Sequence, residues 1–212
     1  MKKILIIWAW SGIGKSLSEY YKKQGYDISL LTRSDYDLWD MNQLEMLWKE
    51  LHSSSYDIII FSAGVWYHRE FRGLSTKEIS EQIIVNTLAP ITVLRAIGPE
   101  VKFVYLSSIM QHIPAKNMSI YSAMKRATSQ ALTAVSLEQN NNILSIDLWA
   151  VKTQMHIKAG MNKMVWKDIQ KIIPKLTKAI ESKKWNTTLF WDWWIMIYLI
   201  FPIYKIFLRY KK

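Results

Sequence analysis

The chain has 212 residues, of which 50% are apolar and 21% charged, and it contains no cysteine. This composition fits one globular domain with a sizeable core and excludes a disordered chain, a disulfide framework, a thiolate metal site and a catalytic thiol. The net charge of +11 is uneven, because residues 1–150 carry 15 Lys and Arg against 14 Asp and Glu, whereas residues 151–212 carry 13 against 3. Four scattered histidines lack metal-ligand spacing, so no metal site is expected.

Short apolar runs alternate with segments of helical periodicity along the first 150 residues. Strands are predicted at 2–7, 27–32, 57–62, 101–107 and 143–148, and helices at 12–24, 42–51, 76–97 and 119–139. Gly25 would cap the first helix, and Pro90 is a candidate kink in the third. Strands that are apolar on both faces and alternate with helices indicate an α/β fold. We expect a Rossmann-type doubly wound parallel sheet of about seven strands, with helices on both faces, in a single domain over residues 1–190.

The remaining residues are basic and apolar. Lysines recur at helical spacing between 167 and 178 beside an apolar face, and Pro174 predicts two short helices or one kinked helix. An apolar run at 193–204 precedes the basic end at 209–212. A helix of this length covers ~18–24 Å, which is short of the ~30 Å hydrocarbon core. A tail at 191–212 could therefore lie on an anionic membrane surface, or pack on its own domain or on a second subunit. Nucleic acid is a less favoured partner, because no recognisable nucleic-acid-binding fold accompanies the charge.

Several motifs follow the predicted strands in a fixed order. The segment WAWSGIG at 8–14 joins the first strand to the first helix, where a dinucleotide pyrophosphate would meet backbone amides. SAG at 62–64 follows the third strand, Asn86 lies in the next helix, and Ser107 and Ser108 end a strand. Tyr121 and Lys125 are four residues apart and so share one helix face. Each motif alone is weak, but the ordered set is specific.

This set resembles the short-chain dehydrogenase/reductase family of the classical type, over residues 1 to about 155. The family's T-G-x-x-x-G-x-G motif matches residues 7–14, its N-A-G motif matches 62–64, and P-G-x-V-x-T looks like 148–153. The resemblance implies a catalytic set of Asn86, Ser108, Tyr121 and Lys125. It implies cofactor contacts at Trp8, Ser11, Gly12, Ile13, Gly14, Arg33, Ser34, Asp37, Leu38, Ser62, Ala63, Gly64, Tyr121, Lys125, Val151 and Thr153.

The chemistry of this set is carbonyl–alcohol interconversion by hydride transfer. The carbonyl oxygen gains charge and needs a proton donor, and the unperturbed pKa of tyrosine, ~10, is high for that task. A Lys125 ammonium one turn away should lower the pKa of Tyr121, while Ser108 orients the carbonyl. By family analogy Lys125 also holds the nicotinamide ribose and Asn86 supports a proton relay. Arg33, just past the second strand, favours NADP over NAD, because a guanidinium pairs with the 2′-phosphate; a solvated surface arginine is the alternative.

Tryptophan stands where glycine is expected. The chain has 11 Trp and only 7 Gly. The total of the two is ordinary for a chain of this length, but tryptophan is unusually frequent and glycine unusually rare. Positions 8, 66, 149 and 185 are all natural glycine sites, and Trp8 fits poorly where a backbone must approach a pyrophosphate. One hypothesis is that UGA codons are read as glycine in the native host. The alternatives are a blocked, non-catalytic site or a rearranged loop that tolerates the tryptophans.

The sequence therefore predicts a cytoplasmic NADP(H)-dependent oxidoreductase, with peripheral contact at the inner face of the membrane left open. A lid that leads into the amphipathic tail would favour a lipophilic carbonyl or alcohol substrate. Family analogy implies a homodimer or tetramer that pairs through residues 76–97 and 119–139. The alternative is a non-catalytic, membrane-associated Rossmann module whose cofactor cleft is blocked by Trp8.

Overall fold

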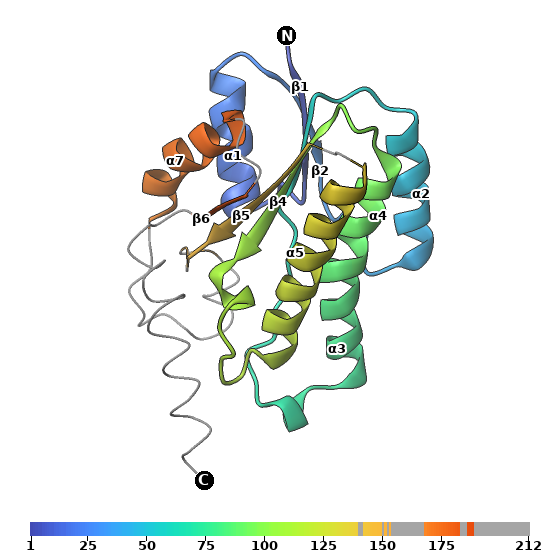
Figure 1. The fold of residues 1–212 in the computed structure, drawn as a ribbon, viewed down its shortest axis with the longest axis vertical. Coiled ribbons are helices and arrows are strands. Elements are labelled where there is room, and N and C mark those ends of the chain that lie inside the picture. Colours follow the sequence, from blue (N-terminus) through green and yellow to red (C-terminus); the bar gives the residue numbers. More distant parts are fainter. Residues whose placement is uncertain (140–141, 150, 152, 154–167, 183–185, 189–212) are drawn as a thin grey trace.

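A computed structural model describes residues 1–139, 142–149, 151, 153, 168–182 and 186–188 of the chain (Figure 1). Within these residues a parallel sheet of six strands has the order β2-β1-β3-β4-β5-β6. The strands are β1 (Lys3–Ile7), β2 (Asp27–Leu31), β3 (Ile58–Phe61), β4 (Lys102–Ser108), β5 (Ile143–Leu148) and β6 (Asn186–Thr188). The predicted doubly wound class is confirmed, with six strands described where about seven were expected. Strand β6 escaped prediction because its sequence, Asn-Thr-Thr, has no apolar run.

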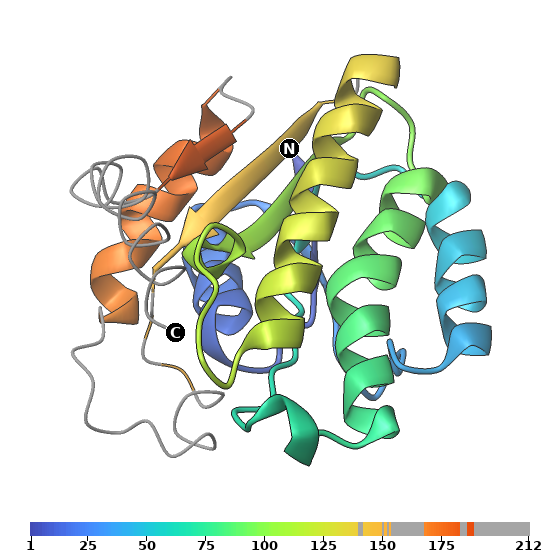
Figure 2. The ribbon, with the colours of Figure 1, turned by 60° about the horizontal axis from the view of Figure 1, so that its bottom comes forward.

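Helices cover both faces of the sheet. Helices α1 (Gly12–Lys23) and α7 (Ile169–Glu181) lie on one face, and α2 (Met41–His52), α4 (Ala89–Ala96) and α5 (Ser119–Gln139) lie on the other (Figures 1 and 2). Strand β1 shows why both faces are apolar, since Ile4 and Ile6 join the core under α1 and α7, whereas Leu5 and Ile7 join the core under α2, α4 and α5. Alternate residues of β1, β3 and β4 thus pack into two separate cores.

The helix predicted at 76–97 is divided. It comprises α3 (Thr76–Ile83), a π-helical turn (Ile84–Leu88) and α4, so the interruption lies before Pro90 and not at it. Pro90 lies in the first turn of α4, where the missing N–H of proline costs least. The wider π turn before it accommodates the hydrogen bond that proline cannot make. The π turn carries the buried Asn86. Pro174, by contrast, lies inside a single helix, α7.

The order of the strands creates a binding edge. The chain passes from β1 to β2 on one side and later returns to place β3 on the other side of β1. Ligands of doubly wound sheets bind at the carboxyl ends of the strands where the order reverses in this way. No helix among the described residues is long and apolar enough to cross a membrane. Trp185 and the predicted tail at 191–212 lie outside the described residues.

Candidate active site

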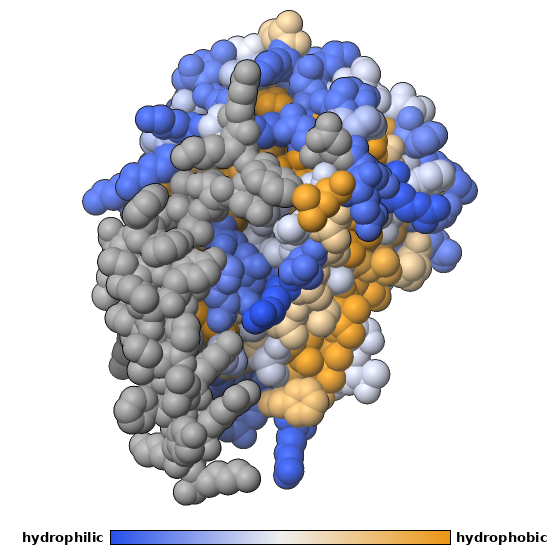
Figure 3. All heavy atoms as spheres, viewed as in Figure 1, coloured by the Kyte–Doolittle hydropathy of each residue, from blue (hydrophilic) through white to orange (hydrophobic). Residues whose placement is uncertain are grey.

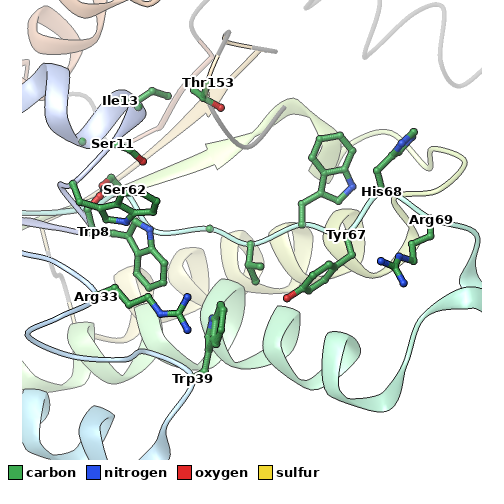
Figure 4. Close-up of a pocket in the computed structure, with 16 residues that line it drawn as sticks. Trp8, Ser11, Ile13, Arg33, Trp39, Ser62, Tyr67, His68, Arg69 and Thr153 are labelled. Carbon is green, nitrogen blue, oxygen red and sulfur yellow. Dashed lines mark hydrogen bonds between the residues drawn. The ribbon is translucent and has the colours of Figure 1, made fainter. Parts of the chain in front are cut away.

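A cavity of about 560 Å³ lies at this edge of the sheet (Figure 4). Its walls come from the turn between β1 and α1, the end of β2 and the segment that follows β3. The residues predicted to contact a cofactor that line it are Trp8, Ser11, Gly12, Ile13, Gly14, Arg33, Ser62, Gly64 and Thr153. The structure therefore brings together residues from four distant parts of the chain in one cavity.

The amino end of α1 forms a close-packed cradle. A Cβ atom on Gly14 would lie 2.5 Å from Ser62 Oγ and 2.8 Å from the Trp8 carbonyl oxygen, so only glycine fits there. Ser62 Oγ is itself fixed, because it donates to the Ile7 carbonyl at 2.7 Å. The Ser11 side chain makes no capping hydrogen bond to the first turn of α1. A helix start with this geometry suits a phosphate group, which its amides can bind directly.

Trp8 is the exception in this cradle. Its φ of 69° lies in the left-handed region, which costs an L-residue roughly 1–2 kcal/mol and which glycine adopts freely. Its backbone N–H donates to the Leu31 carbonyl at 2.7 Å, which holds the turn in this conformation. Its side chain lines the cavity (Figure 4). Position 8 therefore has a backbone conformation typical of glycine but carries the largest of the side chains. The rest of the cradle fits a dinucleotide.

Arg33 projects into the cavity from the end of β2. Its guanidinium lies 3.9 Å from the centre of the Trp39 ring and 3.5 Å from the Asp37 carboxylate. Arg69, which pairs with Glu78 at 3.2 Å, adds a second guanidinium to the lining. Arg33 lies near Trp8 and the cradle, whereas Arg69 lies at the other end of the cavity beside His68 (Figure 4). The Arg33 guanidinium therefore suits an additional phosphate group close to the cradle.

Some of the predicted cofactor contacts do not line this cavity. Leu38, Ala63 and Val151 are buried at 1%, 1% and 2% exposure, so their side chains are core residues. Leu38 packs with the apolar face of α2, which leaves only its backbone for a cofactor contact. Asp37 lies behind Arg33, with which it pairs. Ser34 is exposed and is hydrogen-bonded to Thr32.

The predicted catalytic residues gather beyond Gly64. A Cβ built on Gly64 would lie 3.5 Å from Asn86 Oδ1 and 3.7 Å from Lys125 Nζ, so Gly64 separates the cavity from both. The side-chain amide of Asn86 makes two hydrogen bonds to the backbone of Val65. It accepts from the Val65 N–H at 3.1 Å and donates to the Val65 carbonyl at 2.7 Å. The Asn86 backbone carbonyl accepts hydrogen bonds from Tyr105 and Thr128. Asn86 thus fixes the wall between the cavity and α5.

Tyr121 stands beside Ser108 and the cavity. The two side chains are hydrogen-bonded, and the Tyr121 ring lies 6.1 Å from the ring of Trp66, a cavity residue. Burial raises the pKa of Tyr121 to about 12, although the hydrogen bond from Ser108 opposes this shift. The expected lowering of this pKa by Lys125 is therefore not seen, because desolvation outweighs it.

Lys125 is itself strongly desolvated. It is 2% exposed, donates to the Leu106 carbonyl at 3.1 Å, and lies 4.6 Å above the Tyr105 ring and 5.9 Å from the Tyr121 ring. Burial lowers its pKa to about 7, and the charge of Asp147 acts in the opposite direction. Near neutral pH the unliganded protein thus holds Lys125 partly as a neutral amine.

The pKa of Lys125 predicts how stability depends on pH. Between about pH 7 and 10.5 the unfolded chain binds a proton at this lysine that the folded chain releases, so the free energy of unfolding should rise with pH across this window. Urea unfolding of wild type and Lys125→Met should show the rise reduced in the variant. The exposed Lys171, replaced by Met, is the control and should leave the profile unchanged. Equal slopes in all three proteins would contradict the assignment.

Other residues of the cavity were not predicted as site residues. They are the five that directly follow SAG at 62–64, together with two tryptophans, namely Val65, Trp66, Tyr67, His68, Arg69, Trp10 and Trp39. The five residues at 65–69 could have been predicted as site residues, because they follow the carboxyl end of β3 at the place where the strand order reverses. Tyr67 is held by a hydrogen bond to the buried Glu81. Among the described residues, no three His, Cys, Asp or Glu side chains are grouped to hold a metal ion.

No protein-family model and no curated protein matches this chain. Its structure is similar to that of a short-chain dehydrogenase from Sphingobium yanoikuyae in complex with NADPH, with a TM-score of 0.85 and 18% identity, covering 99% of this chain and 96% of the other. A bulky-bulky ketone specific alcohol dehydrogenase from Comamonas testosteroni gives a TM-score of 0.80 at 17% identity, over 100% and 95% of the two chains. A short-chain dehydrogenase from Burkholderia cenocepacia in complex with NADP gives 0.76 at 15%, over 90% of each chain. The chain therefore has the fold of the short-chain dehydrogenases.

Proposed function

We propose that the chain is an NADP(H)-dependent oxidoreductase of the short-chain dehydrogenase type, which interconverts a carbonyl and an alcohol. One observation carries the proposal: a nucleotide-sized cavity at the amino end of α1 adjoins Ser108, Tyr121 and Lys125, with Gly64 and Trp66 between them. The similar structures from Sphingobium yanoikuyae and Burkholderia cenocepacia hold NADPH and NADP, which supports the choice of cofactor.

Each residue of the site has a separate role in the proposed carbonyl reduction. The cradle at Gly12 and Gly14 would hold the pyrophosphate, and bound NADPH would supply the hydride. Ser108 would donate a hydrogen bond to the substrate oxygen, and the Tyr121 hydroxyl would give that oxygen its proton. The ammonium of Lys125 would stabilise the phenolate that remains. Asn86 would support the relay by fixing the Val65 backbone.

Arg33 gives a test of cofactor choice. We expect Arg33→Ala to weaken NADPH binding by about 10- to 100-fold, the value of one or two charge-assisted hydrogen bonds, and to leave NADH binding unchanged. Titration of both nucleotides by fluorescence measures this. Arg72, exposed and absent from the cavity lining, provides the matched control in Arg72→Ala. An equal loss for both nucleotides would show that Arg33 does not read the 2′-phosphate.

We also propose that position 8 is glycine in the native protein, through reading of UGA as glycine. The left-handed backbone at Trp8 and the Gly and Trp counts support this. Peptide masses from the native host, across positions 8 and 149, test it. Masses that match tryptophan at both positions would overturn the proposal. They would favour the alternative of a non-catalytic module with a blocked cleft.

The function itself is tested with a protein that carries both Trp8→Gly and Trp149→Gly, using NADPH and a panel of ketones and aldehydes. Binding followed by substrate-dependent NADPH oxidation is the expected result. Binding without oxidation of any panel member would favour a nucleotide-binding module. No binding at all would rule out the proposed cofactor.

A lipophilic substrate and contact with an anionic membrane are further proposals. They rest on the sequence of residues 154–212, which bears most of the excess positive charge. Co-sedimentation with phosphatidylglycerol vesicles should be lost when the tail at 191–212 is deleted, a change that leaves β6 intact. Pairing of two chains through residues 76–97 and 119–139 is also a proposal, supported by the exposed Ile83 and Leu137 in these segments. Apolar side chains gather on the side of the molecule where α3, α4 and α5 lie (Figure 3). Sedimentation equilibrium tests the pairing.

A further inference from the structure

A buried carboxylate lies at the carboxyl end of β5, beside the proposed catalytic residues. Asp147 is 8% exposed and pairs in register with Ser107, the neighbour of Ser108. Gln111 donates a hydrogen bond to one of its oxygens, and His112 Nε2 lies 2.8 Å from the other. The proposed mechanism uses none of Asp147, Gln111 and His112.

Asp147 and Lys125 share one face of the sheet. Residues paired in neighbouring parallel strands point to the same side, and the hydroxyl of Ser107 meets that of Ser129 on α5 at 3.2 Å. Asp147 therefore also points toward α5. The Lys125 ammonium reaches the same space, because it donates to the Leu106 carbonyl and lies over the Tyr105 ring.

Neither charge is stable alone in such a place. Removing an ammonium from water favours its neutral form, and an opposite charge nearby restores the charged form. Asp147 is the charge that raises the pKa of Lys125 against the effect of burial. Among the described residues, the other titratable groups that face Asp147 and Lys125 are Tyr105 on β4, Tyr121 on α5 and His112, which follows β4.

We propose that Asp147, held in place by Gln111 and His112, is a positioning residue that increases the fraction of Lys125 in the ammonium form. The carboxylate acts through Lys125 and not on the substrate. The consequence for catalysis rests on the proposed function, in which the ammonium stabilises the phenolate of Tyr121. The electrostatic effect of Asp147 on Lys125 belongs to the unliganded protein.

The test is an NMR titration of the full unliganded chain with ¹³C-labelled lysine. The Lys125 signal is assigned by its loss in Lys125→Met. In Asp147→Asn, which keeps the shape of the side chain, the titration midpoint of Lys125 should fall by about one pH unit. Glu138→Gln removes an exposed carboxylate from the same helix as Lys125 and should leave the midpoint unchanged. An unmoved midpoint in Asp147→Asn overturns the proposal.

Two further variants separate charge from structure. Asp147→Glu keeps the carboxylate and should retain a midpoint near that of wild type. His112→Gln removes one of the two side chains that hold Asp147 but keeps its charge, so the midpoint should also stay. A fall in either variant as large as that expected for Asp147→Asn would show a structural effect and overturn the proposal. If Asp147→Asn does not fold, Asp147→Ser, which also removes the carboxylate, carries the test with the same expected fall.

The titration needs neither cofactor nor turnover. If the protein shows no turnover but the Lys125 midpoint falls in Asp147→Asn, the role of Asp147 stands and the proposed function does not. In an active enzyme the pH profile of kcat gives a second readout. Loss of the ammonium raises the pKa of Tyr121, so the limb that reports this tyrosine should move to higher pH in Asp147→Asn. A lower kcat at every pH, with this limb of the profile at the same pH as in wild type, would indicate that Asp147 has a structural role only.

Discussion

Replacing Tyr121 with phenylalanine should lower kcat by about 10³-fold, the central value for loss of a positioned proton donor. The variant removes one oxygen and keeps the ring that packs 6.1 Å from Trp66. The affinity for NADPH should be unchanged, because the cradle at the start of α1 is untouched. Steady-state oxidation of NADPH and a separate fluorescence titration measure the two quantities.

Tyr105→Phe is the matched control for Tyr121→Phe. Its hydroxyl is also buried near Lys125, but it donates to the Asn86 carbonyl at 3.2 Å and has no hydrogen bond to Ser108 in the structure. We expect a loss of about 1 kcal/mol in stability and only a small loss in kcat. If Tyr121→Phe kept kcat within tenfold of wild type, the proton would come from another group.

Replacing Trp8 with glycine should tighten NADPH binding by at least about 100-fold, or ~2.7 kcal/mol. The indole now lines the cavity where the other residues of the cradle fit a pyrophosphate. Glycine also adopts the φ of 69° without steric cost. NADPH fluorescence on titration gives the dissociation constants of both proteins.

Two variants separate the contributions at position 8. Trp8→Ala empties the cavity but keeps the strained backbone, so its NADPH affinity should lie between those of the tryptophan and glycine forms. Trp48→Gly changes a tryptophan of α2 that stacks on His52 outside the cavity, and it should lower stability without changing affinity. Equal affinities of the tryptophan protein and its Trp8→Gly variant would mean that the indole does not block the cofactor.

The doubly wound class and the gathering of the motifs could be predicted from the sequence. Two-sided apolar runs such as Ile4–Ile7 and Ile58–Phe61 belong only in a covered parallel sheet, and such sheets place strand ends together. The helix carrying Tyr121 and Lys125 was predicted with its observed bounds, although four of its five buried residues are polar or charged, namely Ser122, Lys125, Thr128 and Ser136 beside Leu132.

The features that escaped prediction depend on three-dimensional contacts. Leu38 follows an acidic residue in a plausible motif, but its burial under α2 emerges only from the packing. The pKa of Tyr121 was expected to fall, since four-residue spacing predicts proximity to Lys125 but not the desolvation of both groups. Asp147 lies 22 residues after Lys125 in the sequence, and only the register of β4 with β5 brings it near.

The π turn at Ile84–Leu88 limits how the length of the chain can vary. A π turn contains one residue more than a regular α-helical path would need. Deleting one residue before Asn86 would restore a regular helix, yet it would also rotate Asn86 by about 100° around the axis, away from Val65. Natural variants of this protein should therefore accept insertions and deletions in the loop at 53–57, but none between Ile84 and Leu88.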